Sequence, residues 1–445
     1  MSLRPKWTEE KELFRIKIIT LYLLIEFGKL TLMANDHNPS VILNRRNFLR
    51  AAILTSVGSA FSGQLITALA ADAVTLPFAN GERQLATFPQ KRPLILLTSR
   101  PPQLETPFAV FNEGILTPND AFFVRYHLSQ VPTSIDTDQF RLQIKGNVKS
   151  PLSLSLDDLK TKFPPVEIVA VNQCSGNSRG FSVPRVAGGQ LGNGAMGNAR
   201  WKGVRLKDVL ERAGVGAEVK QVTFQGLDRP PLETTPVFVK ALGVDHALDG
   251  EVMIAYEMNG ADLPMLNGFP IRLIVPGYYG TYWVKHLSEI TLLNEEFKGF
   301  WMSTAYRIPD NSCACVEPGA APGKTKPIER FNVRSFITSL AEGDKIPAGR
   351  KVSVRGIAFD GGYGIVSVRF SSDGGRTWRE AALGDDLGKY SFREWKCEFT
   401  PRAAGNYVLQ ASATNRIGQS QPLMPLWNPA GYMRNVIESV RVTAV

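Results

Sequence analysis

The chain has 445 residues, 44% of them hydrophobic and 21% charged, an ordinary globular composition with length enough for two or three domains. Its net charge of +10 falls to +6 without residues 1–70, which hold nine of the 51 Lys/Arg and five of the 41 Asp/Glu and leave 42 against 36. A net charge of +6 is too small to indicate nucleic-acid binding. It is weakly consistent with an anionic substrate or an acidic partner.

The first seventy residues are typical of an export leader. Arg45 and Arg46 precede a weakly apolar run at 51–69, and the segment 68–70, Ala-Leu-Ala, resembles a cleavage site. The run contains too many Ser, Thr, Gly and Gln residues for a good transmembrane helix, so we expect no stable membrane anchor. The pattern predicts a twin-arginine signal, which carries folded proteins with their cofactors to the periplasm.

Residues 1–32 fit this leader poorly, because a signal normally begins close to its arginines. Their apolar segment 18–25 is too short to span a bilayer and ends at Glu26. Met33 is therefore an alternative start of the chain, and residues 1–32 would then be a mis-assigned extension.

The first two parts of the mature chain differ in proline content and in the periodicity of their apolar residues. Residues 71–105 are rich in proline and lack a regular pattern, which predicts an irregular, extended lead-in. Residues 106–327 mix strand and helix patterns, which indicates an α+β domain with many loops. We expect strands at 140–145, 271–275 and 290–293, a short helix opened by a capping box of Ser155 and Asp158, and a helix at 206–213 that Gly214 ends.

After residue 327 the pattern changes to short alternating segments separated by Gly-rich turns. Regularly spaced strands without a helical period are typical of a β-sandwich. We therefore predict a sandwich over residues 328–445, with strands at 351–355, 364–370, 395–399 and 407–413.

Cys174 is the first candidate for a reactive side chain. It follows an apolar strand and enters a turn of Ser, Gly and Asn residues, with Arg179 five positions later. A turn exposes the thiol, and a cation with backbone N–H groups favours the thiolate, a good ligand for a soft or high-valent metal. From these residues alone, an ordinary half-buried cysteine is the slightly favoured interpretation.

The other cysteines, Cys313, Cys315 and Cys397, are too few for a disulfide framework in a chain of this length. The pair Cys313-Ala-Cys315 offers too few ligands for zinc; metal binding and redox activity stay open, and a structural or silent role is favoured. Either of the two is a possible disulfide partner for Cys397 in an oxidising compartment. No Cys-x-x-Cys-His segment is present, so we expect no haem in this chain.

The segment 174–179 resembles the molybdenum-ligating cysteine loop of the sulfite oxidase family. Other segments resemble that family in the same order, and the likeness spans about residues 100–440. They are Phe122–His127, Phe224–Asp228, Ala255–Gly260, Gly268–Arg272, Gly280–Lys285, Gly299–Arg307, Asp373–Trp378 and Trp427–Gly431. Each is a weak signal alone, whereas the collinear set is specific. With the leader and without a haem motif, the resemblance narrows to exported bacterial sulfite dehydrogenases.

This resemblance implies a molybdopterin-binding domain followed by an immunoglobulin-like sandwich of the family's dimerisation type. Cys174 would ligate molybdenum beside the two sulfurs of the pterin. Arg125 and Arg179 would hold the anionic substrate, because a guanidinium offers charge and a bidentate fork. His127 and Tyr306 would complete the catalytic set as polar groups near the metal.

The resemblance also implies a set of residues that contact the cofactor. Arg272 and Lys285 would hold its phosphate, and Asp228 would accept hydrogen bonds from the pterin. Without the resemblance, surface ion pairs would be the ordinary role of the two cations. The complete predicted set is Phe123, Val124, Arg125, Tyr126, His127, Cys174, Asp228, Asn267, Arg272, Trp283, Val284 and Lys285.

Two positions depart from the family pattern. Asn267 stands where the animal enzymes typically carry histidine, which leaves its contact with the cofactor open. The turn 360–364 of the predicted sandwich lacks the arginine that the animal enzymes direct into the substrate pocket. We therefore expect a pocket with fewer cations.

The implied activity is the oxidation of sulfite to sulfate with electrons passed to a c-type cytochrome, in a homodimer or a heterodimer with a cytochrome subunit. The alternative within this group is a related exported molybdoenzyme, such as a sulfane dehydrogenase or a sulfoxide reductase. The intact segment 174–177 with Arg179 favours sulfite. The alternative from another class is an exported binding protein without catalytic activity, which metal content would distinguish.

Overall fold

Strands dominate residues 73–445, the part of the chain that the structure, a computed structural model, describes. The predicted leader and the alternative start at Met33 lie outside the described residues. Within 73–445, no helix has the length and apolar character needed to cross a membrane. A part that mixes strands and short helices comes first and an all-β part follows, in the predicted order.

Residues 73–105 lie in regular strands, so the prediction of an irregular lead-in was wrong. Every proline of this segment lies in a turn between strands, where a missing N–H costs no ladder hydrogen bond. The sheet is antiparallel and continues into Val124–Arg125. Its strands, in order, are β1 (Ala73–Thr75), β2 (Glu82–Ala86), β3 (Leu94–Thr98), β4 (Gln103–Glu105) and β5 (Val124–Arg125).

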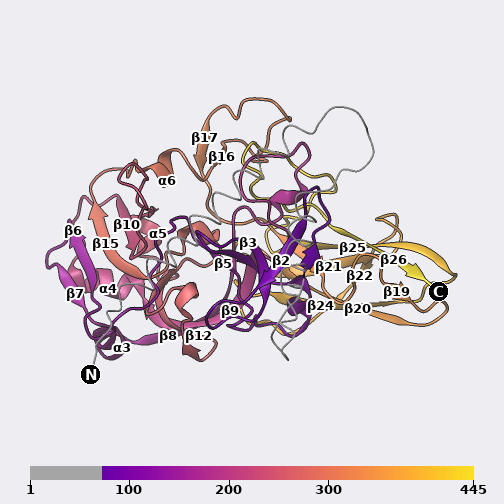
Figure 1. Ribbon diagram of the computed structural model, residues 1–445, viewed down its shortest axis with the longest axis horizontal. Helices are drawn as coiled ribbons and strands as arrows, with labels where there is room; N and C mark the ends of the chain where they lie inside the picture. Colours follow the sequence, from indigo (N-terminus) through magenta and orange to yellow (C-terminus); the bar gives the residue numbers. More distant parts are fainter. Residues whose placement is uncertain (1–72) are drawn as a thin grey trace, which may run out of the picture. The chain divides into compact units, whose positions relative to one another are not determined.

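Two further sheets form most of the mixed part, and Figure 1 shows β10, β15 and β6 side by side. The first has the order β11 (Val239–Gly243), β10 (Gln221–Gly226), β15 (Leu287–Leu293), β6 (Leu142–Gly146) and β7 (Leu152–Leu154), with β15 and β6 parallel. The second has the order β13 (Ala261–Asp262), β12 (Met253–Met258), β9 (Met196–Arg205) and β8 (Pro165–Gln173), with β14 (Arg272–Ile274) beside β12. The strands predicted at 140–145, 271–275 and 290–293 are thereby confirmed as β6, β14 and β15.

The helices are short, and two begin or end as predicted. Asp158 N donates to Ser155 Oγ and Ser155 N to Asp158 Oδ2, which confirms the capping box. Gly214, at φ +75°, ends the second predicted helix. The α-helices are α3 (Leu156–Lys162), α4 (Leu206–Ala213), α5 (Val244–Ala247) and α6 (Phe300–Ser303), and the 3₁₀ helices are η1 (Phe108–Asn112), η2 (Arg179–Phe181), η3 (Met265–Asn267) and η4 (Gly280–Tyr282).

The C-terminal part is a sandwich of two sheets, preceded by a hairpin of β16 (Arg307–Pro309) and β17 (Thr325–Pro327). One sheet has the order β18 (Arg334–Ile337), β20 (Val352–Phe359), β24 (Arg393–Phe399) and β23 (Ala382–Leu383). The other has the order β19 (Lys345–Ile346), β26 (Ser439–Ala444), β25 (Gly405–Asn415), β21 (Ile365–Ser371) and β22 (Arg379–Glu380). Apolar side chains from both sheets are buried between them, as alternation predicts.

The sandwich packs against the strand that leads to Cys174. One apolar cluster contains Val171 of β8 together with Phe336 and Phe359 of the sandwich. Val171 N also donates to Tyr390 O at 2.9 Å. The end of β8 is therefore held from two directions, which fixes the position of the loop that follows.

Candidate active site

The loop after β8 presents Cys174 at a fixed position. Cys174 N donates to Ala195 O at 2.9 Å, and Asn177 N donates to Cys174 O at 3.0 Å. The Asn177 side chain in turn accepts from Ala195 N at 3.0 Å. Ser178 has φ +70°, a left-handed residue that reverses the chain. The turn predicted after Cys174 is confirmed at 175–178, whereas the prediction that it exposes the thiol was wrong, because Cys174 is only 9% exposed and lines a cavity.

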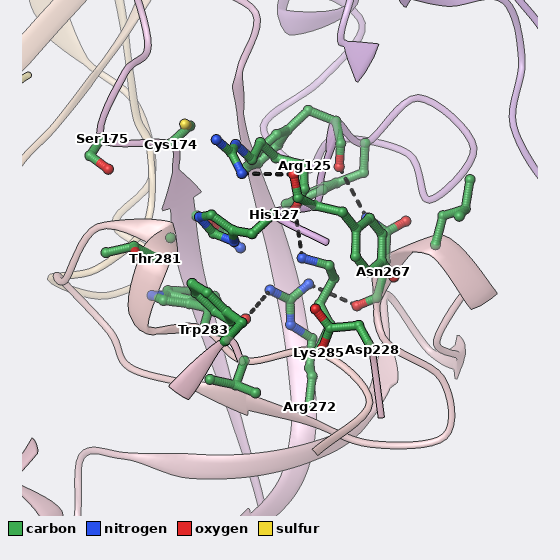
Figure 2. A pocket seen from close by; sticks show the side chains of 18 of the residues that line it. Arg125, His127, Cys174, Ser175, Asp228, Asn267, Arg272, Thr281, Trp283 and Lys285 are labelled. Atoms are coloured by element: carbon green, nitrogen blue, oxygen red, sulfur yellow. Dashed lines mark hydrogen bonds between the residues drawn. The ribbon is translucent and has the colours of Figure 1, made fainter. Parts of the chain in front are cut away.

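The cavity encloses about 630 Å³ of space when its open mouth is included. Except for Val124 and Arg179, all the predicted site residues line it. Figure 2 shows Cys174 and Ser175 at one end, and Arg272, Asp228 and Lys285 at the other. The predicted residues that line it are Phe123, Arg125, Tyr126, His127, Cys174, Asp228, Asn267, Arg272, Trp283, Val284, Lys285 and Tyr306.

Val124 and Arg179 lie behind the cavity wall. Val124 does not line the cavity and packs in an apolar cluster with Leu94 and Leu104. The Arg179 Nε donates to Ala430 O at 2.9 Å, and its guanidinium lies 4.9 Å from the ring centre of Tyr432. The Tyr432 ring stacks on Tyr306 at 5.5 Å. Arg179 therefore supports Tyr306, a residue of the cavity wall, through Tyr432. Contrary to the prediction, Arg179 itself does not line the cavity.

We call Cys174, Arg125, His127 and Tyr306 the thiol end. His127 Nε2 and the Tyr306 hydroxyl are hydrogen-bonded to each other. Burial and the Arg125 charge hold the pKa of His127 well below its usual value, and burial raises the pKa of Tyr306. The pair is therefore uncharged at neutral pH, and Arg125 provides the positive charge among these four residues.

We call Arg272, Lys285 and Asp228 the cationic end. Arg272 Nη1 donates to Asn267 O at 2.8 Å and Nη2 to Trp283 O at 3.2 Å. Lys285 Nζ donates to Arg125 O at 2.7 Å, and Figure 2 shows these contacts. Both cations thus bond main-chain oxygens, and in residues 73–445 neither makes an ion pair.

Burial destabilises both positive charges, and the nearby Asp228 carboxylate offsets that of Lys285 only in part. Burial lowers the pKa of Arg272 to about 9 and, with the Arg272 charge, that of Lys285 to about 7. Arg272 is 2% exposed, so the ordinary interpretation as a surface ion pair is wrong for it. A bound anion would supply the missing negative charge, and a phosphate suits a guanidinium beside an ammonium.

The cavity wall also carries buried polar atoms without partners. They are Asn172 Oδ1, Ser175 Oγ, Thr281 Oγ1 and Arg272 Nε, all from residues that line the cavity. Buried polar groups normally find a partner, so four around one cavity indicate a polar group that binds there. A pterin with a phosphate and a thiolate-bound metal fits this set of donors and acceptors. Cys174 would then hold the metal, Arg272 and Lys285 the phosphate, and Asp228 the pterin.

Asn267 lines the cavity, but its side chain is already bonded within the protein. Its Oδ1 accepts from Lys91 Nζ, and its Nδ2 donates to Phe123 O at 3.1 Å. Lys91 is 5% exposed, and burial lowers its pKa to about 7. Sequence reasoning missed Lys91, because it placed this residue in an irregular segment. It also missed the lining residues Asn172, Ser175, Phe238 and Thr281.

Cys313 and Cys315 are joined to each other by a disulfide, and Cys397 is a buried free thiol. The suggested pairing with Cys397 is therefore wrong. No group of three or more His, Cys, Asp or Glu residues arranged to hold a metal occurs within residues 73–445.

The turn 360–364 contributes nothing to the cavity wall. The Asp360 carboxylate accepts the N–H groups of Gly362, Tyr363 and Gly364 and the side-chain amide of Asn415. It is a closed structural turn, so the lining lacks the additional cation, as the sequence predicts.

Two protein families match the chain. Residues 127–301 match the oxidoreductase molybdopterin binding domain, and residues 325–444 match the Mo-co oxidoreductase dimerisation domain. These matches, with the order of sheets, confirm the predicted fold and the predicted class of molybdopterin-binding oxidoreductase.

Curated relatives and a solved structure agree with these matches. Mitochondrial sulfite oxidase of Homo sapiens is 35% identical over 373 residues, 80% of this chain and 66% of the human protein. Sulfite oxidase of Gallus gallus is 33% identical over 361 residues, 78% of this chain and 77% of that protein. The sulfane dehydrogenase SoxCD from Paracoccus pantotrophus matches with a TM-score of 0.66 at 22% identity, over 86% of this chain and 92% of that chain, a likeness of fold alone. The chain thus spans about two thirds of its human relative's length.

Proposed function

The chain belongs to the sulfite oxidase family, and from this premise we propose that it oxidises sulfite to sulfate with a molybdenum-molybdopterin cofactor. The observation that carries the proposal is one cavity that joins a free thiol, Cys174, to the cations Arg272 and Lys285, neither of which forms an ion pair within residues 73–445. Identity of 35% to a sulfite oxidase favours sulfite as the substrate.

The bound cofactor supplies two-electron redox and oxygen-transfer chemistry. In the net reaction, sulfite and water give sulfate, two protons and two electrons. Arg125 reaches the thiol end from β5, where its guanidinium can hold an oxyanion. Tyr306 and His127 share a hydrogen bond there, so their phenolic oxygen and Nε2 can hold or pass on a proton.

We further propose export by the twin-arginine pathway and a c-type cytochrome as the electron acceptor. The arginine pair at 45–46 supports the first. The match of 325–444 to a dimerisation domain supports a homodimer or an assembly with a cytochrome subunit. Replacing Arg45 and Arg46 with lysine should retain the protein in the cytoplasm, and undiminished export of that variant would rule out this signal.

The decisive experiment is a steady-state assay of the purified protein with sulfite, using ferricyanide or cytochrome c as acceptor. We expect about one molybdenum per chain and rapid reduction of both acceptors. A protein with molybdenum that oxidises a sulfane sulfur substrate but not sulfite would be the related dehydrogenase instead. A protein without molybdenum would favour the non-catalytic binding protein.

A further inference from the structure

Lys240 is a fully buried lysine without an acidic partner. It lies on β11 with 0% of its surface exposed, and its Nζ donates to Trp301 O at 2.7 Å. The ammonium otherwise faces two aromatic rings, 4.5 Å from the centre of Tyr282 and 5.4 Å from that of Tyr306. In the described part of the chain, no carboxylate forms an ion pair with it.

Such a lysine is costly to the fold. An unpaired buried ammonium loses its hydration, and burial accordingly lowers the pKa of Lys240 to about 7. A methionine would fill a similar volume without that cost. The charge does not stabilise the fold and, unlike the similarly buried Lys91, Lys240 contacts a residue of the thiol end, Tyr306, so its position indicates a role in the chemistry of that end.

The strand that carries Lys240 contacts both members of the hydrogen-bonded pair at the thiol end. Side chains two residues apart on a strand point to the same side, so Phe238, just before β11, accompanies Lys240. The Phe238 ring stacks on His127 at 3.9 Å between ring centres, while the Lys240 ammonium lies over the Tyr306 ring. One short segment therefore presents an apolar ring to His127 and a cation to Tyr306.

The thiol end otherwise has little positive charge. Arg125 is the cation among its four residues, Arg179 is turned away towards Tyr432, and the turn 360–364 does not reach the cavity. A second cation directly behind Tyr306 would strengthen the attraction for an oxyanion, because Coulomb interactions persist over several ångströms in a buried site.

We propose that Lys240 is a positioning residue that supplies positive charge to the thiol end through the Tyr306 ring and so strengthens the binding of sulfite and other oxyanions. This inference rests on the proposed function for its substrate. It extends to sulfate, which is the product and a non-reacting oxyanion.

The test compares the holoenzyme with its Lys240→Met variant at about pH 6, where a lysine with a pKa of about 7 is mostly charged. We expect KM for sulfite and the inhibition constant for sulfate to rise about tenfold, as the loss of one nearby charge predicts, with a smaller change in kcat. Molybdenum content should be unchanged, and Tm should be equal or higher, because an unpaired buried charge is removed. A residue with a purely structural role would instead lower Tm and leave the sulfate constant unaltered.

Lys91→Met is the matched control, since Lys91 is also buried but binds Asn267 and main-chain oxygens. We expect it to leave the sulfate constant of the loaded enzyme within twofold. Lys240→Gln, which keeps a donor for Trp301 O, is the second variant and should repeat the loss of anion affinity. Unchanged sulfate affinity in both Lys240 variants, or loss of the fold in both, would overturn the proposal. Calorimetric titration with sulfate tests Lys240 even if the wild type fails to oxidise sulfite, so the two failures are distinguishable.

Discussion

The two ends of the cavity carry positive charge in different ways. At the cationic end, Arg272 and Lys285 are fixed by main-chain oxygens and have no acid partner within ion-pair distance in the described chain. At the thiol end, Arg125 is accompanied by His127 and Tyr306, which are uncharged at neutral pH. A permanently bound phosphate needs the first arrangement. A substrate that must leave as product is better served by the second, because excessive affinity would slow its release.

The largest effect is expected at the thiol itself. Cys174→Ser should abolish sulfite oxidation while preserving the fold, because a hydroxyl is a harder and weaker ligand than a thiolate. The pterin and its phosphate should remain bound, since their contacts lie at the other end of the cavity. Steady-state assay, circular dichroism and pterin fluorescence of the denatured protein measure the three properties. Near wild-type turnover would show that Cys174 is not the metal ligand.

At the cationic end, Arg272→Gln should act on cofactor retention. A hydrogen bond to a charged group contributes about 1.5–3 kcal/mol, which corresponds to a loss of affinity of roughly 10- to 150-fold. We expect purified protein with a low molybdenum content but a normal KM for sulfite in the fraction that keeps the cofactor. A full complement of molybdenum would mean that the phosphate binds elsewhere.

A pair of arginine variants sharpens the description of the thiol end. Arg125→Gln should raise KM for sulfite by roughly 10- to 150-fold, the loss expected for one charge-assisted contact. Arg179→Gln should raise KM less, because Arg179 faces Tyr432 and acts on the cavity only through the stacked Tyr306. Equal effects on KM, measured at a fixed ionic strength, would place Arg179 within reach of the substrate after all.

Local signals in the sequence predicted much of this site. The Gly, Asn and Ser residues after β8 predicted a turn that starts at a cysteine. The capping box at Ser155 could be predicted from four consecutive residues. The resemblance to a family then located most of the lining correctly, including Tyr306 and Lys285. The place of a residue in a motif did not show which way its side chain points, however. Val124 packs in an apolar cluster outside the lining, and the Arg179 guanidinium is bound to Ala430 O.

The features that sequence reasoning missed depend on contacts between distant segments. Lys91 meets Asn267 across 176 positions of the chain, and Lys240 meets Trp301 across 61. No periodicity links such residues, and a lysine is ordinarily expected at the surface. The strands of residues 73–105 were missed for a different reason, because the prolines of this segment, all in turns, obscured four strands, β1 to β4.

The smallest predicted effect concerns stability near the cationic end, where Lys91 is buried beside Asn267. Its pKa is lowered from 10.5 to about 7, mainly by burial. Below pH 7 the folded state bears the whole cost of a buried ammonium. Between pH 7 and 10.5 the unfolded chain binds a proton that the folded chain does not, so stability rises with pH, by at most about 1.4 kcal/mol per pH unit.

Lys91→Met removes this term. The free energy of unfolding by urea, measured at pH 7 and at pH 9, should therefore rise less in the variant than in the wild type, while Lys240 and Lys285 contribute equally to both. The slope is diagnostic, because a lysine stabilised by an acid has a raised pKa and would show no change in stability between pH 7 and pH 9. Parallel pH profiles for the two proteins would show that Lys91 is hydrated. The buried positive charge near the cationic end would then come from Arg272 and Lys285 alone.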